Sequence, residues 1–119
     1  MFANDDARAS QIGSSGSGRI AELNDHLRCS NVGGRIAITQ GVLATGSVPA
    51  ILARVRGFDA FDSDNDPYGQ RDFGALVCGG ENIFWKIDYY DLAMQFGSLD
   101  PADPSVTCRV LTVMLASEY

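Results

Sequence analysis

The sequence predicts an α+β domain in which an antiparallel sheet, a three-strand meander with a possible extra N-terminal strand, packs against two or three helices. Apolar residues recur at helical spacing in the first half of the chain, and two segments of the second half alternate at the period of a strand. With 119 residues, of which 45% are hydrophobic, the chain is long enough for one core. We therefore expect residues 18–119 to form a single globular domain behind a flexible, Ser- and Gly-rich tail at residues 1–17.

The first predicted helix covers residues 19–30. Ile20, Leu23 and Leu27 lie three or four positions apart there, which forms one apolar stripe along a helix. Residues 35–41 then alternate between apolar and polar side chains, which is typical of a half-buried strand. The pattern leaves the place of this strand in the sheet open.

A second helix is predicted over residues 47–61. Ser47 is a suitable N-cap and Pro49 falls in the first turn, where the missing N–H of proline costs no hydrogen bond. The apolar residues of this segment share one side, so Arg54 and Arg56 are expected to point into solvent.

Two strands are predicted at residues 73–79 and 82–90, joined by a tight turn at Gly79 and Gly80. Glycine pairs favour such hairpins because both central residues need positive φ. A shorter segment, residues 92–98, is expected to add the third strand of the meander.

The C-terminal segment, residues 105–116, is predicted to be a buried helix. Asp103 could cap it, Pro104 fits a first helical position, and the few polar residues form a narrow stripe. The β-branched residues in this segment also allow a strand, and the pattern does not separate the two possibilities.

Charge is unevenly distributed along the chain. The net charge is −6, and residues 57–119 carry −8 while residues 1–56 carry +2. An acidic protein attracts neither phosphate backbones nor anionic membranes, so we expect a basic protein surface as partner and no direct binding of nucleic acid. No apolar run approaches the ~20 residues that span a bilayer, and the N-terminus lacks the order of a signal peptide. A cytoplasmic protein without a membrane role is therefore expected.

Carboxylates and aromatic residues gather between residues 58 and 91. Eight of the fifteen acidic residues lie in this segment, whereas the only histidine of the chain, His26, lies outside it. This composition favours binding over catalysis, because general acid–base and nucleophilic schemes rely most often on histidine. The residues expected to contact the partner are Asp62, Asp64, Asp66, Tyr68, Asp72, Phe84, Asp88, Tyr90 and Asp91.

Strand alternation divides residues 82–90 between two faces. One face should carry Ile83, Trp85, Ile87 and Tyr89 into the core, and the other should carry Phe84, Lys86, Asp88 and Tyr90. The second set is compatible with cross-strand packing or with a partner-binding surface, since aromatic residues are enriched at interface hot spots.

The aspartates of the segment also raise the possibility of a metal site. Asp62, Asp64 and Asp66 occupy the first, third and fifth places of a calcium loop, but Pro67 stands where that loop needs glycine. A solvated turn is the simpler interpretation. No catalytic residue, metal ligand or cofactor is therefore assigned, and a divalent-metal-dependent hydrolase or transferase that uses the cluster up to Asp72 remains the alternative.

Three blocks, FDAFDSDNDPYGQRDFGA, FWKIDYYD and GSLDPADPSVTCRVLTVMLASEY, carry a family resemblance. From about Arg19 to Tyr119 the chain resembles a family of short, mainly alphaproteobacterial proteins catalogued as a domain of unknown function (DUF3768). The resemblance implies a compact bacterial cytoplasmic protein, often encoded on plasmids and other mobile elements. It brings no established activity, cofactor or catalytic residue. The family pattern often has acidic and His residues where this chain has Gln70 and Arg71, so a metal site at those positions is not expected here.

Together these observations lead us to expect a small, acidic, non-catalytic protein-binding domain. One version is an inhibitor of a nucleic-acid-handling complex, of the anti-CRISPR or anti-restriction type, whose carboxylates occupy a channel meant for phosphates. Another is an interaction or scaffolding protein that recruits its partner without inhibiting it. The identity of the partner and the oligomeric state are not specified by the sequence.

Overall fold

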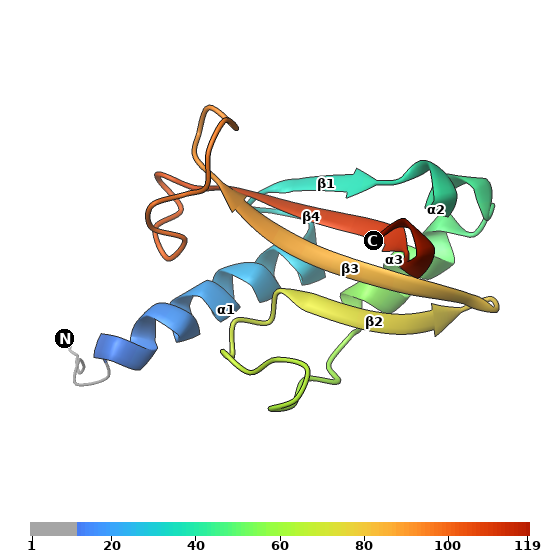
Figure 1. The fold of residues 1–119 in the computed structure, drawn as a ribbon, viewed down its shortest axis with the longest axis horizontal. Coiled ribbons are helices and arrows are strands. Elements are labelled where there is room, and N and C mark those ends of the chain that lie inside the picture. Colours follow the sequence, from blue (N-terminus) through green and yellow to red (C-terminus); the bar gives the residue numbers. More distant parts are fainter. Residues whose placement is uncertain (1–11) are drawn as a thin grey trace.

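The structure is a computed structural model that describes residues 12–119, with side chains from residue 16 onward. Two helices, α1 and α3, lie against one face of a four-stranded sheet, and the short α2 and η1 lie near one end of that sheet (Figure 1). The elements are α1 (Ile12–Ser30), β1 (Arg35–Ile38), α2 (Gln40–Ala44), α3 (Val48–Arg56), β2 (Phe73–Cys78), β3 (Glu81–Tyr90), β4 (Cys108–Leu115) and η1 (Ala116–Glu118). No helix among these residues is both long and apolar enough to cross a membrane.

The sheet has the strand order β1-β4-β3-β2. The strands β2, β3 and β4 form an antiparallel meander, whereas β1 pairs with β4 in the parallel direction. The α+β class is thus confirmed, but the expectation of a purely antiparallel sheet is wrong. The chain between β1 and β4 contains two helices and two strands, which is long enough to allow either direction, and the parallel register sets Ile36 and Ile38 beside Leu111 and Val113.

The predicted C-terminal helix is the strand β4, which is the third strand of the meander. Its residues alternate, with Arg109, Leu111 and Val113 at most 2% exposed on the side of the helices. Apolar residues occupy both faces of this central strand, including the partly buried positions on the side away from the helices, so they do not alternate cleanly with polar ones and the run resembles a buried helix in sequence. The carboxylate of Asp103 accepts hydrogen bonds from the N–H and hydroxyl of Ser105, which closes a turn and does not cap a helix.

Residues 92–98, expected to be a strand, form a loop instead. The Asp91 Oδ1 atom accepts hydrogen bonds from the N–H groups of Gln95 and Phe96, which folds the chain back after β3. Only an isolated bridge between Tyr90 and Gly97 continues the pairing. A side chain that binds the backbone in this way competes with strand formation.

The hairpin between β2 and β3 is confirmed, with φ of +60° at Gly79 and +82° at Gly80. The helix predicted over residues 47–61 is found as α3, but it ends at Arg56 with Gly57 as C-cap, and the Ser47 side chain makes no capping hydrogen bond. The first helix begins at Ile12, so residues 12–17 of the expected tail belong to α1. Residues 1–11 of that tail lie outside the described residues.

Trp85 lies at the centre of the core and is 0% exposed. Phe58 and Phe61 approach its ring edge to face, with centroids 5.5 and 6.1 Å away. The α carbon of Gly74 on β2 faces the indole, and a Cβ there would overlap the ring. The other members of the core cluster are Leu27, Val42, Ile51, Val55, Ile83, Ile87, Leu111 and Val113.

A buried arginine joins α1 to the end of α3. Arg28 Nη1 donates hydrogen bonds to the carbonyl oxygens of Val55, Arg56 and Phe58 at 3.0, 3.1 and 2.8 Å. Cationic groups are favourable at helix C-termini because the last carbonyls lack partners within the helix. Arg28 therefore fixes where α3 ends and where the following loop begins.

Candidate functional site

The predicted contact residues lie in three different places. We call residues 57–72, which join α3 to β2, the acidic loop, and we call the side of the sheet opposite α1 and α3 the open face. Asp62, Asp64, Asp66 and Tyr68 lie in the outer part of the acidic loop. Phe84, Asp88 and Tyr90 lie on the open face, with Asp91 just beyond β3. Asp72, the last residue of the acidic loop, is partly buried.

Two carboxylates of the acidic loop hold its own backbone. Asp62 Oδ1 accepts hydrogen bonds from the N–H groups of Asp64 and Asn65 at 2.9 and 3.0 Å. Asp66 Oδ1 accepts one from the N–H of Arg71 at 3.0 Å. The contact between Asp62 and Asp64 is that of an Asx turn, and all three bind side chain to local backbone, as expected for a solvated turn.

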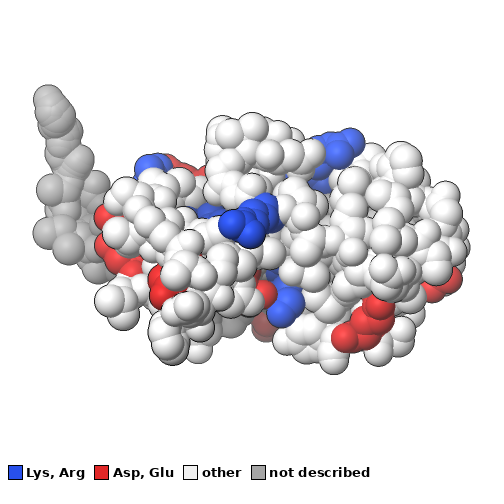
Figure 2. All heavy atoms as spheres, turned by 90° about the horizontal axis from the view of Figure 1, so that it is seen from above, with Lys and Arg blue, Asp and Glu red and all other residues white. Residues whose placement is uncertain are grey.

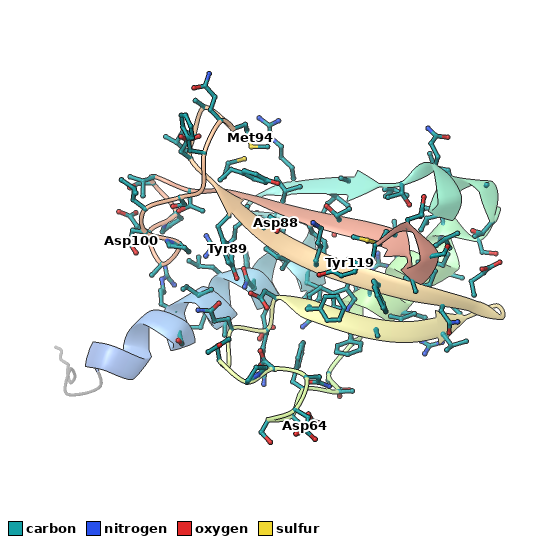
Figure 3. All side chains as sticks on the ribbon, viewed as in Figure 1. Asp64, Asp88, Tyr89, Met94, Asp100 and Tyr119 are labelled. Carbon is teal, nitrogen blue, oxygen red and sulfur yellow. The ribbon has the colours of Figure 1, made fainter. Side chains whose placement is uncertain are left out.

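The tip of the acidic loop points away from the rest of the domain. Figure 3 shows Asp64 there, and its carboxylate has no hydrogen-bond partner among the described residues. Tyr68 is 79% exposed beside it. Within residues 12–119, no group of three or more His, Cys, Asp or Glu side chains is arranged to hold a metal ion.

Asp72 belongs to a buried polar network. Tyr89 Oη donates to Asp72 Oδ2 at 3.1 Å, and Asn24 Nδ2 donates to Tyr89 Oη at 2.8 Å. The same amide donates to the carbonyl oxygen of Gln70 at 2.9 Å, and Asn24 Oδ1 accepts from Arg109 Nε at 3.0 Å. The network connects α1, the end of the acidic loop, β3 and β4.

Burial controls the ionisation of this network. Burial raises the pKa of Asp72, only partly offset by the hydrogen bond from Tyr89, and burial also raises the pKa of the Tyr89 hydroxyl. It lowers the pKa of Arg109. Because Asn24 is 0% and Arg109 2% exposed, these groups stabilise the fold and cannot reach a partner. The sequence offered one signal for the network, a lone arginine within the apolar run of β4.

The open face carries an aromatic cluster beside an ion pair. Phe73 and Phe84 lie 5.1 Å apart between ring centroids, and Tyr119 covers both at 6.1 and 5.6 Å. Next along β3, Lys86 Nζ lies 3.0 Å from Asp88 Oδ2, and this hydrogen bond raises the pKa of Lys86. The open face therefore has the features of both predictions, because its aromatic residues pack across strands and also leave aromatic surface exposed.

Two hollows flank β2. The outer hollow, on the open face, has a volume of about 390 Å³ and is lined by Ala75, Leu76, Val77, Asn82, Phe84 and Ala116. The inner hollow, on the side of α3, has a volume of about 280 Å³ and is lined by Arg54, Gly57, Phe58, Asp59, Ala60, Ala75 and Leu76. Both hollows therefore open along the same stretch of strand.

The loop after β3 exposes large apolar side chains that sequence analysis assigned to a strand. Leu92, Phe96 and Leu99 are 64%, 71% and 101% exposed. Met94 adopts a positive φ of 59°, which is uncommon for a residue other than glycine. We call residues 92–99 the apolar loop. Exposed apolar side chains that gather in one loop are characteristic of contact surfaces.

The acidic residues of the second half do not form one patch. Figure 3 shows Asp64 at the tip of the acidic loop and Asp88 over the sheet, at separate places on the molecule. From above, basic and acidic side chains are interspersed in several separate places (Figure 2). The open face is thus a mixed aromatic and charged surface, and the tip of the acidic loop lies apart from it.

Comparisons with known proteins give one match. A family model described as "Protein of unknown function (DUF3768)" matches residues 38–118. A search of the curated proteins found no match, and a search of the solved structures found none either.

Proposed function

This chain belongs to the DUF3768 family, and we propose that it is a small non-catalytic domain that binds a basic partner protein through the open face. The observation that carries the proposal is the arrangement of the sheet. The helices α1 and α3 cover one face only (Figure 1). The other face presents the aromatic cluster of Phe73, Phe84 and Tyr119 with the outer hollow beside it. Aromatic residues in a partly apolar surface are the usual centres of binding energy in protein interfaces.

Charge supplies the second part of the proposal. Asp64 and Asp88 carry carboxylates that are exposed or half exposed, and the chain as a whole carries −6. Such charges raise the rate of encounter with a basic surface, whereas the buried aromatic contacts set how long the complex lasts. The exposed carboxylates and the aromatic cluster would therefore act on different steps of binding.

A narrower proposal concerns the kind of partner. A basic channel that normally holds phosphates would accept the acidic loop, whose Asp64 carboxylate is free of internal hydrogen bonds in the described part of the chain. The chain would then act as an inhibitor of a nucleic-acid-handling complex in the bacterial cytoplasm. Competition between the chain and a DNA duplex for one partner separates inhibition from mere recruitment.

The test uses a partner recovered from the host and measures association and dissociation rates at several salt concentrations. Reversal of Asp64, Asp66 and Asp88 to lysine should lower the association rate by about tenfold or more at low salt, since steered association is strongly salt-dependent. Phe84→Ala should instead raise the dissociation rate. Unchanged rates in both variants would show that the partner does not use these surfaces.

A matched control exists on the same strand. Glu81 is an exposed acidic residue at the hairpin, away from both the acidic loop and Asp88 along β3. Glu81→Lys changes the net charge by the same amount as each single reversal. If Glu81→Lys lowers the association rate less than Asp64→Lys or Asp88→Lys alone, the position of the charge matters. An equal loss would show that only the total charge does.

A further inference from the structure

The strand β2 is one edge of the sheet, and its outward backbone groups can be identified. Asp72 O accepts a hydrogen bond from Ile87 N at 2.8 Å, so the residues of β2 with even numbers pair with β3. In an antiparallel ladder the intervening residues direct both N–H and C=O to the other side. Ala75, at the middle of β2, therefore points both backbone groups away from the sheet.

A neighbouring side chain confirms this direction. Arg54 Nη1, on α3, donates to the carbonyl oxygen of Val77 at 2.9 Å from outside the sheet. Among the described residues, no hydrogen bond reaches the N–H or the C=O of Ala75. One donor and one acceptor are thus free in the centre of an edge strand.

Arg54 covers the carbonyl of Val77 at one end of the edge, but the strand itself lacks the usual protection against pairing. The six residues of β2, FGALVC, include neither a charged residue nor a proline. Edge strands of monomeric proteins are normally guarded by lysine, proline or a bulge, because an open edge pairs with any other extended chain. Val77 is 55% exposed on this strand, so the apolar edge is accessible.

The two hollows fit the geometry of an added strand. Both are lined by Ala75 and Leu76, one on each side of the sheet. Successive side chains of a strand point to opposite faces, so a residue paired with Ala75 would enter the outer hollow and its neighbours would enter the inner one. The outer hollow offers Phe84 and Val77 to an apolar side chain.

The charges around this edge indicate which kind of chain would pair with β2. Arg54 and Asp59 both line the inner hollow, but Arg54 Nη1 is held by the carbonyl oxygen of Val77, whereas the Asp59 carboxylate forms no ion pair within the described residues. A second copy of the chain, paired through the same strand, would add its own net charge of −6 to that of the first. A segment with basic residues on one side would instead place a cation near Asp59.

We propose that β2 binds an extended segment of the partner as a fifth strand, with an apolar residue in the outer hollow and a basic residue near Asp59 in the inner one. The inference rests on the proposed function and specifies how the partner is bound. Main-chain hydrogen bonds to Ala75 would contribute affinity, and the alternate side chains would give specificity.

The test begins with peptides selected from a random displayed library on the full chain. Ala75→Pro removes an N–H that the pairing with β3 does not use, and proline is tolerated at outward positions of edge strands, so the variant should keep its circular dichroism. The selected peptides should alternate apolar and basic residues and bind Ala75→Pro about tenfold more weakly or worse. Ala75→Ser keeps the N–H and should bind as the wild type does.

A second measurement does not depend on any variant folding. A peptide methylated on the backbone nitrogen of the residue paired with Ala75 should lose binding to the wild-type chain, and the Ala75 amide should become protected from hydrogen exchange when the unmodified peptide binds. Peptides that tolerate both the methylation and Ala75→Pro would overturn the inference. So would a failure to select any peptide that depends on Ala75, or a dimer in sedimentation that Ala75→Pro dissociates.

The experiment can reject strand addition at β2 without rejecting the proposed function. A partner whose binding responds to Phe84→Ala and to the charge reversals but not to Ala75→Pro would use the open face without adding a strand. A partner that responds to none of them would remove both proposals.

Discussion

The two faces of β3 differ in what their side chains contact. Towards the helices, Ile83, Trp85 and Ile87 are at most 3% exposed, whereas the side chains of Lys86 and Asp88 on the open face are 36% and 37% exposed. Residues one position apart therefore serve different purposes, because strand side chains alternate between faces. Substitutions on the first face should change the free energy of unfolding, and those on the second should change binding.

The largest expected effect tests the covered face. Trp85→Ala removes a fully buried ring that contacts Phe58 and Phe61, and it should lower the free energy of unfolding by about 3–5 kcal/mol. Urea titration of the wild type and variant measures this loss. Phe84→Ala, its neighbour on the open face, is the matched control and should cost well under half as much. Equal losses would mean that the open face is also core.

The buried polar network that connects α1, the acidic loop, β3 and β4 should give the next largest effect on the free energy of unfolding. Asn24→Ala leaves Arg109 Nε without its acceptor and Tyr89 Oη without a donor, so we expect a loss of about 2–4 kcal/mol. Arg109→Met removes the charge along with its need for a partner. In a double-mutant cycle the two losses should therefore add to more than the loss of the double variant. Simple additivity would show that the two side chains are not coupled.

The comparison also explains how much the sequence could predict. The faces of β3 were assigned correctly because alternation with a strong apolar set specifies which side is buried. The strand β4 was assigned as a helix because its apolar residues occur on both sides, so the period of two is hidden. The alternation in β4 that does exist places Arg109 beside Leu111 and Val113, where an arginine is not expected.

The candidate site was predictable only in part. Local composition identified the acidic loop and the outer residues of β3, because those residues are close in sequence. It could not show that Asp72 is drawn inwards, since its partners Asn24 and Tyr89 come from distant elements. The edge position of β2 depends on the strand order, which no local pattern contains. The exposed apolar loop was missed because Leu92 and Phe96 resemble strand residues until the Asp91 turn is known.

Within the acidic loop, Asp72 is partly buried and Asp64 is exposed, so the two carboxylates repeat the contrast between the faces of β3. The pH dependence of stability tests this difference. Burial raises the pKa of Asp72 above its ordinary value of 3.8. The folded state therefore favours the protonated acid, and the stability that this contributes is present below 3.8 and is lost as the pH rises through the raised pKa. Asp72→Asn is neutral throughout and should remove this loss. Urea titrations on both sides of the transition should show the variant gaining stability relative to the wild type at higher pH, and an equal difference at all pH values would contradict this.

The smallest expected effect concerns metal binding by the outer carboxylates of the acidic loop. A metal ion bound by the acidic loop would bind the folded state preferentially and raise the melting temperature by mass action. Asp62 and Asp66 already accept backbone hydrogen bonds, and Asp64 points away at the tip, so we expect little response to millimolar Ca²⁺ or Mg²⁺. Thermal unfolding with and without the ions measures the response, and Asp64→Ala is the control for ordinary salt effects. A rise of several degrees that Asp64→Ala abolishes would show that the loop rearranges around a metal, and it would favour the metal-dependent hydrolase or transferase over the binding protein.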